Sequence, residues 1–490
     1  MARSWDELWL LNEMGEGVKP NLEAPLQGQH KDREVIRAMW SILKALRENP
    51  ELLYESQKRR GLSKEIVDRA IELDRKWREK LKETNFLRKQ RNELSRLLKE
   101  KKDEKIIEEA RILSEKVKKA EEELKILEDE LERTLLSIPN IVHESVPIGR
   151  DESENVPVRY WGRPKVYFED VDKFLKITNG KVSYEVIDFK PLGHADAVEI
   201  FGWADTARAS KVAGSRFYYL FDDLVWLDFA LTLYAVDFLA KNGFRVVFPP
   251  LMLRKEAYKG VTAFSDFEDV IYKIEGEDLH LIATSEHAIA AMFMNETIEE
   301  SDLPMMYAGV SPCFRKEAGA HGKDTKGIFR VHQFNKVEQF VFCLPEHSWE
   351  WHEKLIENAE MLWQGLGIPY RIVNICTGDL GIVAAKKYDL EAWMPSQANY
   401  REMVSCSNCT DWQSYRLKIR YAEKKGLPSK GFVHTLNSTA IATTRAITAI
   451  IENFQLEDGR VEIPKVLGKY LENIDSAPKD YIMPRNARKV

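Results

Sequence analysis

The sequence predicts an α+β protein in which an antiparallel helical coiled-coil arm precedes a domain built on a largely antiparallel sheet. Two observations support this fold class. Residues 64–136 contain no glycine and no proline, and their apolar residues recur at alternating gaps of three and four, which is the spacing of a coiled-coil seam. From about residue 160, glycine and proline return and short apolar runs alternate with helical patterns, which is typical of α+β domains.

The arm is predicted to consist of two helices of about 33 residues that reverse direction near residues 99–105, and to reach about 50 Å. The whole chain has a net charge of −6, but its distal arm, residues 75–119, has a net charge of +8. The rest of the chain therefore has a net charge of −14. A basic arm indicates polyanion binding. A solvated coiled-coil surface also interleaves Lys and Glu, and explains the charge equally well. The predicted seam residues are Ile66, Ala70, Leu73, Trp77, Leu81, Ala110, Leu113, Val117, Ala120, Leu124, Leu127 and Leu131.

A second domain is expected after the arm, because Pro139, Pro147 and Pro157 interrupt the sequence there and indicate a linker. In this domain, residues 224–239 are predicted to form a helix that ends at Asn242-Gly243. Residues 245–248, 331–334 and 337–342 are predicted to form strands, since they are short apolar runs rich in β-branched and aromatic residues.

Composition excludes several classes of protein. No stretch approaches the roughly 20 apolar residues of a membrane helix, and the N-terminus lacks the apolar run of a signal peptide. Five cysteines exclude a disulfide scaffold and fit a reducing cytoplasm. Cys406 and Cys409 form one CxxC pair, and without a second pair we interpret them as reduced cysteines rather than zinc ligands.

Residues suited to nucleotide chemistry are concentrated between residues 309 and 342. Residues 314–317 (Phe-Arg-Lys-Glu) are followed by a glycine-rich stretch and then by Arg330, Phe334 and Glu338. We predict a β-hairpin, with arginine forks for phosphate and an aromatic face for adenine. If its second strand is regular, these last three residues share one face. An Arg-x-Glu triplet alone is a weak signal, but the whole block is specific.

Several segments together resemble the class II aminoacyl-tRNA synthetases, and within them the seryl family. Residues 243–250, 314–334 and 434–445 resemble the three class II motifs, of which the first belongs to the dimer interface. Thr284-Ser285-Glu286 resembles the seryl family's serine-binding loop, and residues 400–408 resemble its metal and ATP segment. The sequence at 406–412 is similar to archaeal and eukaryotic members. The resemblance covers about residues 39–470, and residues 64–136 lie where this family has its tRNA arm.

The resemblance implies a cytoplasmic homodimer, not bound to membrane, that activates L-serine with ATP and Mg²⁺. It implies transfer of serine to tRNA(Ser), and to tRNA(Sec) where the cell contains one. It also implies an N-terminal extension at residues 1–38, a tRNA-binding domain at residues 39–150 and a class II catalytic domain at residues 151–490. No side-chain nucleophile is needed, because the serine carboxylate attacks the α-phosphorus of ATP and the protein supplies positioning and positive charge.

Roles for individual residues follow from the same resemblance. Arg315 and Arg445 would be the catalytic residues, and Glu402 and Ser405 would hold Mg²⁺. The residues expected to bind serine are Thr284, Ser285, Glu286, Arg315, Glu338, Asn437 and Thr439. The residues expected to bind ATP are Arg315, Lys316, Glu317, Arg330, Val331, Phe334, Glu402, Met403, Val404, Ser405 and Arg445. Glu338 is expected to define serine, since alanine leaves a buried acceptor of the hydroxyl proton unpaired.

Two other functions fit parts of the sequence. A non-catalytic RNA-binding relative would keep the arm but should lack one of Arg315, Glu317, Glu338 or Arg445, and all four are present. A class II enzyme for threonine or proline would share the motifs, but the arm and the loop at residues 284–286 argue against it. The activity with serine is therefore the one that the sequence favours.

Overall fold

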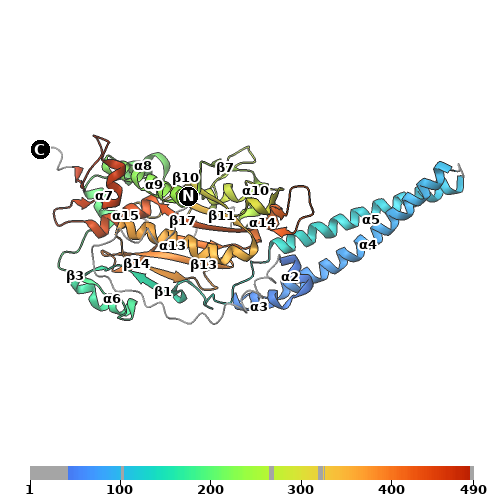
Figure 1. The fold of residues 1–490 in the computed structure, drawn as a ribbon, viewed down its shortest axis with the longest axis horizontal. Helices are drawn as coiled ribbons and strands as arrows, with labels where there is room; N and C mark the ends of the chain where they lie inside the picture. The colour runs from blue at the N-terminus through green and yellow to red at the C-terminus, as the bar shows by residue number, and fades with distance from the viewer. Residues whose placement is uncertain (1–41, 101–103, 264–269, 318–323, 325, 486–490) are drawn as a thin grey trace. The chain divides into compact units, whose positions relative to one another are not determined.

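The computed structural model describes residues 42–100, 104–263, 270–317, 324 and 326–485. The part of the chain that follows the arm is organised around an eight-stranded sheet that is antiparallel at every pairing except that of β10 with β6 (Figure 1). The α+β prediction is therefore confirmed. In spatial order the strands are β1 (Val156–Trp161), β12 (Tyr370–Asn374), β13 (Lys386–Met394), β14 (Asn399–Asn408), β17 (His434–Ala442), β11 (Gln333–Cys343), β10 (Met305–Phe314) and β6 (Arg245–Val247).

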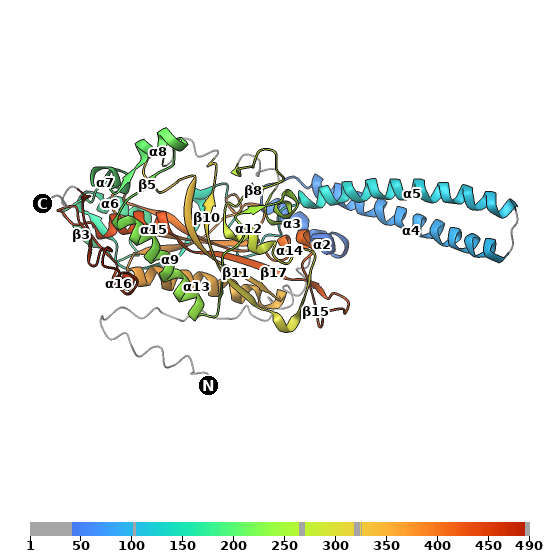
Figure 2. The ribbon, with the colours of Figure 1, turned by 90° about the horizontal axis from the view of Figure 1, so that it is seen from above.

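The two faces of this sheet have different roles, and β11 shows the division most clearly. Its Val337 and Val341 belong to the largest buried apolar cluster, together with residues of α9 (Asp223–Lys241), α13 (Ser348–Leu366) and α15 (Thr443–Phe454). On the opposite face, Phe340 and Phe342 pack in a second cluster with residues of α10 (Lys255–Val261), α12 (Ser285–Ala290) and α14 (Trp412–Leu417). The helices α12 and α14 lie near β11 and β17 in Figure 2. Because side chains alternate along a strand, Phe334, Lys336 and Glu338 share the face of this second cluster.

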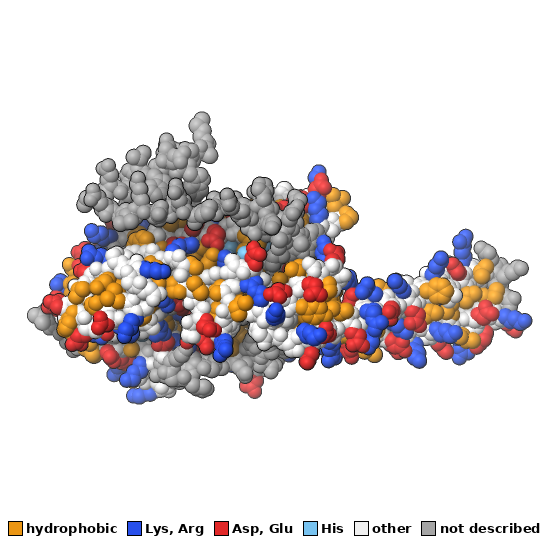
Figure 3. All heavy atoms as spheres, turned by 90° about the horizontal axis from the view of Figure 1, so that it is seen from below, with side chains coloured by type: hydrophobic (Ala, Val, Ile, Leu, Met, Phe, Trp, Pro, Cys, Tyr) orange, Lys and Arg blue, Asp and Glu red, His pale blue; other side chains and the backbone are white. Residues whose placement is uncertain are grey.

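The predicted coiled-coil hairpin is present as α4 (Glu65–Glu100) and α5 (Glu104–Leu136), preceded by α2 (Ile42–Glu48) and α3 (Glu51–Arg59). Val117 and Ala120 are among the seam residues buried between the two long helices. Lys80 pairs with Glu123 across the helices. Basic and acidic side chains are interspersed along the arm (Figure 3), so the helices are joined by an apolar seam and by ion pairs at its edges.

The root of the arm is hydrogen bonded to two loops of the following domain. Asn140 donates from Nδ2 to the carbonyl oxygens of Val383 (2.8 Å) and Cys409 (2.7 Å). Arg416, which is stacked 3.4 Å from the ring centroid of Trp412, donates from Nη2 to the carbonyl oxygen of Leu136 (3.2 Å) at the end of α5. Buried backbone carbonyls at a helix end need such donors, so these contacts fix the root of the arm.

Two strand predictions are confirmed and one is partly wrong. Residues 245–247 form β6 and residues 337–342 lie in β11, but the strand predicted at residues 331–334 begins only at Gln333. His332 lies outside the strand because its backbone N–H donates to the carbonyl of Arg216 (3.1 Å). Arg330 therefore lies before the strand, and it does not continue the face of Phe334 and Glu338. The predicted helix at residues 224–239 is confirmed as α9, with Asn242 as its C-cap.

The remaining elements form smaller sheets and connecting helices around the main sheet. No helix in the described ranges is long and apolar enough to cross a membrane. The extension predicted at residues 1–38 lies outside the described residues. The remaining elements are β2 (Lys165–Tyr167), α6 (Val171–Thr178), β3 (Glu185–Ile187), α7 (His194–Ile200), β4 (Ala204–Asp205), α8 (Thr206–Ala213), β5 (Tyr219–Leu220), β7 (Met252–Leu253), β8 (His280–Leu281), β9 (Thr297–Glu299), β15 (Arg420–Ala422), β16 (Gly431–Phe432), β18 (Val461–Glu462), α16 (Lys465–Leu471) and β19 (Tyr481–Ile482).

Candidate active site

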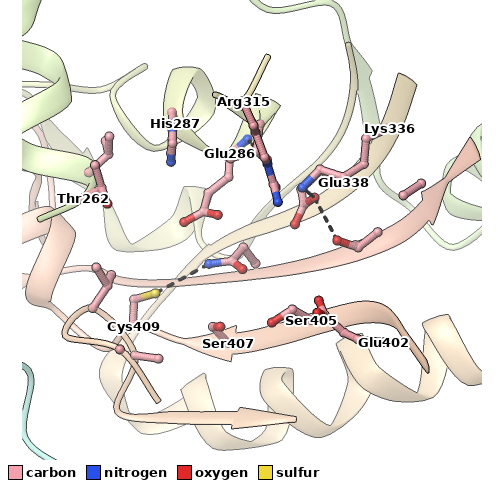
Figure 4. A pocket seen from close by; sticks show the side chains of 18 of the residues that line it. Thr262, Glu286, His287, Arg315, Lys336, Glu338, Glu402, Ser405, Ser407 and Cys409 are labelled. Carbon is pink, nitrogen blue, oxygen red and sulfur yellow. Dashed lines mark hydrogen bonds and ion pairs between the residues drawn. The ribbon is translucent and has the colours of Figure 1, made fainter. Parts of the chain in front are cut away.

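A polar cavity of about 410 Å³ lies on the sheet face that carries Phe334, Lys336 and Glu338. Its wall comes from β11, β14, β17, the start of α12 and the loop at residues 380–384. In Figure 4, Glu286, Arg315, Lys336 and Glu338 face Ser405 and Ser407 across this cavity. Eleven of the seventeen predicted site residues line it: Thr284, Glu286, Arg315, Phe334, Glu338, Glu402, Met403, Ser405, Asn437, Thr439 and Arg445.

The carboxylate of Glu338 is held from two sides. Lys336, two residues earlier on the same face of β11, forms an ion pair with Glu338 Oε2. Thr439 of β17 donates from Oγ1 to the same oxygen (3.3 Å). Glu338 and Thr439 are direct partners in the β11–β17 ladder, where the register shifts between Val337 and Glu338. The sheet itself therefore brings the two predicted serine-binding residues together.

A β-bulge in β14 brings the two predicted magnesium ligands to the cavity. Glu402 and Ser405 are three residues apart, which in a regular strand would place them on opposite faces. Leu390 and Glu391 of β13 pair with Val404 and Glu402, so that Met403 is the extra residue on β14. The bulge re-aims the strand, and both Glu402 and Ser405 line the cavity.

The loop predicted to bind serine forms the N-terminus of α12. Thr284 is the N-cap, and its Oγ1 accepts from the backbone N–H of Glu286 (3.2 Å). Glu286 accepts through Oε1 from Gln413 Nε2 (3.0 Å). Ser285 lies behind the wall, where its Oγ donates to the carbonyl of Gly309 (3.3 Å). A Cβ at Gly309 would lie 2.6 Å from Ser285 Oγ, so glycine is required for this close approach.

Two arginines that are predicted to bind ATP line the cavity. Arg315 donates from Nε to the carbonyl of Ala283 (3.2 Å), and its guanidinium carbon lies 5.2 Å from the ring centroid of Phe334. Arg445 donates from Nη1 to the carbonyl of Glu402 (3.0 Å) and lies 3.2 Å from the carboxylate oxygen Oε1 of the same residue. Both guanidinium groups keep further donors for a ligand, since each has five N–H groups.

Burial and charge determine the protonation of the cavity wall. Burial, with a smaller contribution from the charge of Glu338, raises the pKa of Glu286 to about 7, against the opposing charge of Lys336. Burial also lowers the pKa of His287 to about 3, so its imidazole is neutral. For Glu402, burial opposes ionisation, but the charges of Arg445 and nearby cations outweigh it and lower the pKa of the carboxyl. The wall thus contains carboxylates that respond differently to pH.

Arg330 lies in a neighbouring cavity of about 670 Å³ that shares only its Glu402–Arg445 wall with the first. It pairs there with Glu317 (3.1 Å). Placing Arg330 on one face with Phe334 and Glu338 was therefore wrong, because the regular strand does not extend back to it. Val331 packs in an apolar cluster and Val404 in the main core. Of the predicted residues, the two cavities lack Ser285, Lys316, Glu317, Val331 and Val404.

Sequence reasoning missed several residues of the site. Lys336, His287 and Cys409 are among those that line the cavity, and Gln413, outside the wall, holds Glu286. Lys336 could have been found, because it has the same strand parity as Phe334 and Glu338. Cys409 accepts from Asn437 Nδ2 (3.6 Å). Both Cys406 and Cys409 are buried, free cysteines.

Family models match both parts of the chain. The model of the tRNA synthetase class II core domain (G, H, P, S and T) matches residues 269–454. The model of the seryl-tRNA synthetase N-terminal domain matches residues 43–142. The fold, the cavity and the first of these matches define a class II tRNA synthetase.

Individual relatives identify the branch of that class. The serine–tRNA ligase of Archaeoglobus fulgidus is 79% identical over 453 residues, which are 92% of this chain and 100% of that protein. The serine–tRNA ligase of Sulfolobus acidocaldarius is 59% identical over 91% of this chain and 98% of that protein. The crystal structure of seryl-tRNA synthetase from Pyrococcus horikoshii complexed with ATP is similar with a TM-score of 0.84 and 53% identity, covering 90% of this chain and 99% of that chain. The chain belongs to the seryl-tRNA synthetase family.

Proposed function

We propose that the chain is a serine–tRNA ligase, which activates L-serine with ATP to seryl-adenylate and transfers the seryl group to tRNA(Ser). The observation that carries this proposal is the charge pattern of the cavity wall, where Glu286 and Glu338 lie beside Arg315. A zwitterionic amino acid needs both signs of charge within reach, and ATP needs cations and an aromatic face. The serine–tRNA ligases that share 79% and 59% of their residues with this chain support the same activity.

In the first step, a carboxylate oxygen of serine attacks the α-phosphorus of ATP, and the bond to the bridging oxygen breaks as pyrophosphate leaves. Arg315, anchored through Nε on Ala283, would hold the serine carboxylate and the α-phosphate with its other donors. Phe334 would stack on adenine, and Arg445 would hold the γ-phosphate. Fixed cations at the developing charge are the main source of catalysis here. ATP as a substrate is supported by the relative from Pyrococcus horikoshii, whose structure holds ATP.

Arg330, from the neighbouring cavity, would contact the terminal phosphates if the nucleotide extends past Glu402 and Arg445, which line both cavities. In the second step, a hydroxyl of the terminal ribose of tRNA attacks the seryl carbonyl carbon, and AMP leaves with the electrons of the broken acyl–phosphate bond. The contributions of Ser285 to serine binding, and of Lys316, Glu317, Val331 and Val404 to ATP binding, remain predictions.

The residues at β14 fit a magnesium ion. Glu402 and Ser405 supply a carboxylate and a hydroxyl, the hard oxygen ligands that Mg²⁺ takes. Asp389 pairs with Ser405 in register, and its Oδ1 is buried without a hydrogen-bond partner in the described part of the chain. The described residues contain no ready-made cluster of three or more His, Cys, Asp or Glu, so the ATP phosphates would complete the ligand set. A bound ion would neutralise charge on the phosphates.

We also propose that the chain is a homodimer. Phe229 and Leu233 of α9 and Val246 of β6 are about half exposed, and Phe248 is 76% exposed. These residues lie in or near the segment that resembles the first class II motif, and an exposed apolar patch of this kind indicates a protein interface. A two-fold symmetric dimer buries the same patch from both subunits.

The remaining assignments concern domains, location and the second tRNA. We propose a tRNA-binding domain at residues 39–150, a catalytic domain at residues 151–490 and an extension at residues 1–38. The five free cysteines support a reducing cytoplasm. Charging of tRNA(Sec), where the cell contains one, is proposed because the resemblance to the seryl family implies it.

The test is pyrophosphate exchange with each of the twenty amino acids, followed by aminoacylation of a tRNA(Ser) transcript. We expect ATP-dependent pyrophosphate exchange with serine to exceed exchange with every other amino acid. We also expect the enzyme to aminoacylate the tRNA(Ser) transcript with serine. Absent exchange, or a preference for threonine or proline, would contradict the proposal. Omitting Mg²⁺ in the presence of a chelator should abolish exchange. Ca²⁺ should restore it poorly, because it is larger than Mg²⁺ and takes more ligands at longer distances.

A further inference from the structure

Lys336 is a buried cation in the wall of the amino-acid site, and the family resemblance gave it no role. Its side chain is 6% exposed, and its ammonium forms an ion pair with Glu338 Oε2. It lines the cavity from β11, two residues from Phe334 and two from Glu338. In Figure 4 its side chain lies beside Glu338 and points into the site. Burying an ammonium group is unfavourable unless its charge is used, so the position calls for an explanation.

The contacts to Glu338 are unevenly distributed between its two oxygens. Lys336 and Thr439 both contact Oε2. In the part of the chain that the structure describes, no hydrogen bond or ion pair ends on Oε1, and this oxygen is not among the fully buried atoms that lack a partner. Two contacts on one oxygen fix the orientation of the carboxylate, since a rotation would break both. Oε1 is then presented as an acceptor for a ligand in the cavity.

The same ammonium acts on a second carboxylate. Glu338 raises the pKa of Glu286, whereas Lys336 lowers it. Lys336 therefore lies close enough to reduce the repulsion between two carboxylates that both face the amino-acid site. Without this cation, the two carboxylates would repel each other more strongly across the site.

We propose that Lys336 is a positioning residue for substrate selection: it holds Glu338 as an oriented acceptor, so that Oε1 receives the side-chain hydroxyl of serine. This inference rests on the proposed function. Serine differs from alanine by one hydroxyl. A site built to bind that hydroxyl rejects alanine, because the acceptor in the site stays unpaired when alanine binds. Selection then depends on how firmly the acceptor is held, and Lys336 supplies one of the two holding contacts.

The experiment measures pyrophosphate exchange with serine and with alanine and compares the ratio of their kcat/KM values. Lys336→Met keeps an unbranched side chain, one heavy atom shorter than that of lysine, and removes the charge. We expect this variant to lower the serine-to-alanine ratio by about tenfold, the effect of one weakened hydrogen bond to a charged group, while the KM for ATP stays within about twofold. Lys386→Met is the matched control, because Lys386 is also a buried lysine on a sheet strand, 9% exposed, but lines neither cavity.

A double-mutant cycle separates positioning from a general structural effect. Glu338→Gln should lower the ratio by itself, and adding Lys336→Met should lower it no further, because the group that Lys336 positions is already altered. If Lys336→Met does not fold, as judged by its thermal unfolding, Lys336→Gln is used in the same cycle. An unchanged ratio in a folded variant, or independent multiplicative losses in the double variant, would overturn the inference.

The outcomes for Lys336 and for the proposed function are distinguishable. A wild-type enzyme that exchanges best with an amino acid other than serine contradicts the proposed function, whatever the variants do. A wild-type enzyme that prefers serine, together with a folded Lys336→Met variant that keeps the full serine-to-alanine ratio, contradicts only the role of Lys336. A fall of the ratio in Lys386→Met equal to that in Lys336→Met would also overturn it, since the loss would then follow from removing any buried lysine.

Discussion

Lowering the pH from 8 to 6 should weaken the use of serine about tenfold, through one carboxylate. Glu286, predicted to receive the serine ammonium, has its pKa raised to about 7 by burial and by the charge of Glu338. With that pKa, about nine-tenths of the groups are ionised at pH 8, half at pH 7 and one-tenth at pH 6. If only the ionised form binds the ammonium, kcat/KM for serine falls in the same proportion.

The direction of the effect follows from the sign of the shift. The ordinary pKa of a glutamate is 4.5, and the folded protein raises it, so the neutral form is favoured as the pH falls through 7. Lys336, Gln413 and Arg315 oppose this shift but do not cancel it. The carboxylate needed for the ammonium is therefore present above pH 7 and is lost below it. A glutamate with an ordinary pKa would give a flat profile over the same range.

The assay is pyrophosphate exchange at saturating ATP, with serine varied at each pH between 6 and 8. Glu286→Gln is the control: it should have low kcat/KM for serine, and its profile should lack the step near pH 7. Thermal unfolding over the same range should show that the protein stays folded. A wild-type profile that is flat from pH 6 to 8, or a step that survives in Glu286→Gln, would refute the reasoning.

Three further predictions concern the arm, its root and the dimer. The first removes residues 85–119 by joining Thr84 to Ala120 through a short turn, where the two helices already touch (Thr84 Oγ1 to Ala120 O, 3.5 Å). This deletion should lower tRNA charging by at least about 100-fold, because phosphate contacts are lost, and should leave pyrophosphate exchange with serine within about twofold. A parallel loss of both activities would contradict this prediction. Arg416→Gln should lower the free energy of unfolding by about 1–3 kcal/mol, since carbonyls at the end of α5 lose a buried donor. An unfolding midpoint equal to that of the wild type would contradict this prediction. Phe248→Asp should yield monomers in sedimentation, because it places a charge in the proposed apolar interface. The control is Val212→Asp, at a site that is 74% exposed on α8, which should leave the dimer intact.

The arm could be predicted from the sequence because its determinants are local. Apolar residues at gaps of three and four, without glycine or proline, specify two long helices wherever the rest of the chain lies. The seam residues Val117 and Ala120 are buried as expected. The hairpin of β10 and β11 was also predicted, since its strands are consecutive along the chain and pair with each other.

The finer geometry of the site depends on features that no local pattern carries. The faces of Glu402 and Ser405 are set by an extra residue in the pairing of β13 with β14, and a register shift is not visible in either strand alone. Arg330 was misplaced for the same reason, because the start of β11 depends on a hydrogen bond between His332 and the distant Arg216. Spacing can suggest which residues serve the site, but the strand partners decide which of them meet.

The cavity also explains why its chemistry needs no nucleophile of its own. Before substrates bind, Glu338 pairs with Lys336 and Glu402 pairs with Arg445, so the buried charges are compensated in the free protein. In the proposed function, the substrates would bring matching charges: the serine ammonium for Glu286, and phosphates that would compete with Glu402 for Arg445. Binding would then exchange internal ion pairs for ion pairs with substrate, and little uncompensated charge would be buried. Fixed charges of this kind stabilise a transition state without having to reorient, and the rigid strands that carry Glu338 and Glu402 keep them in place.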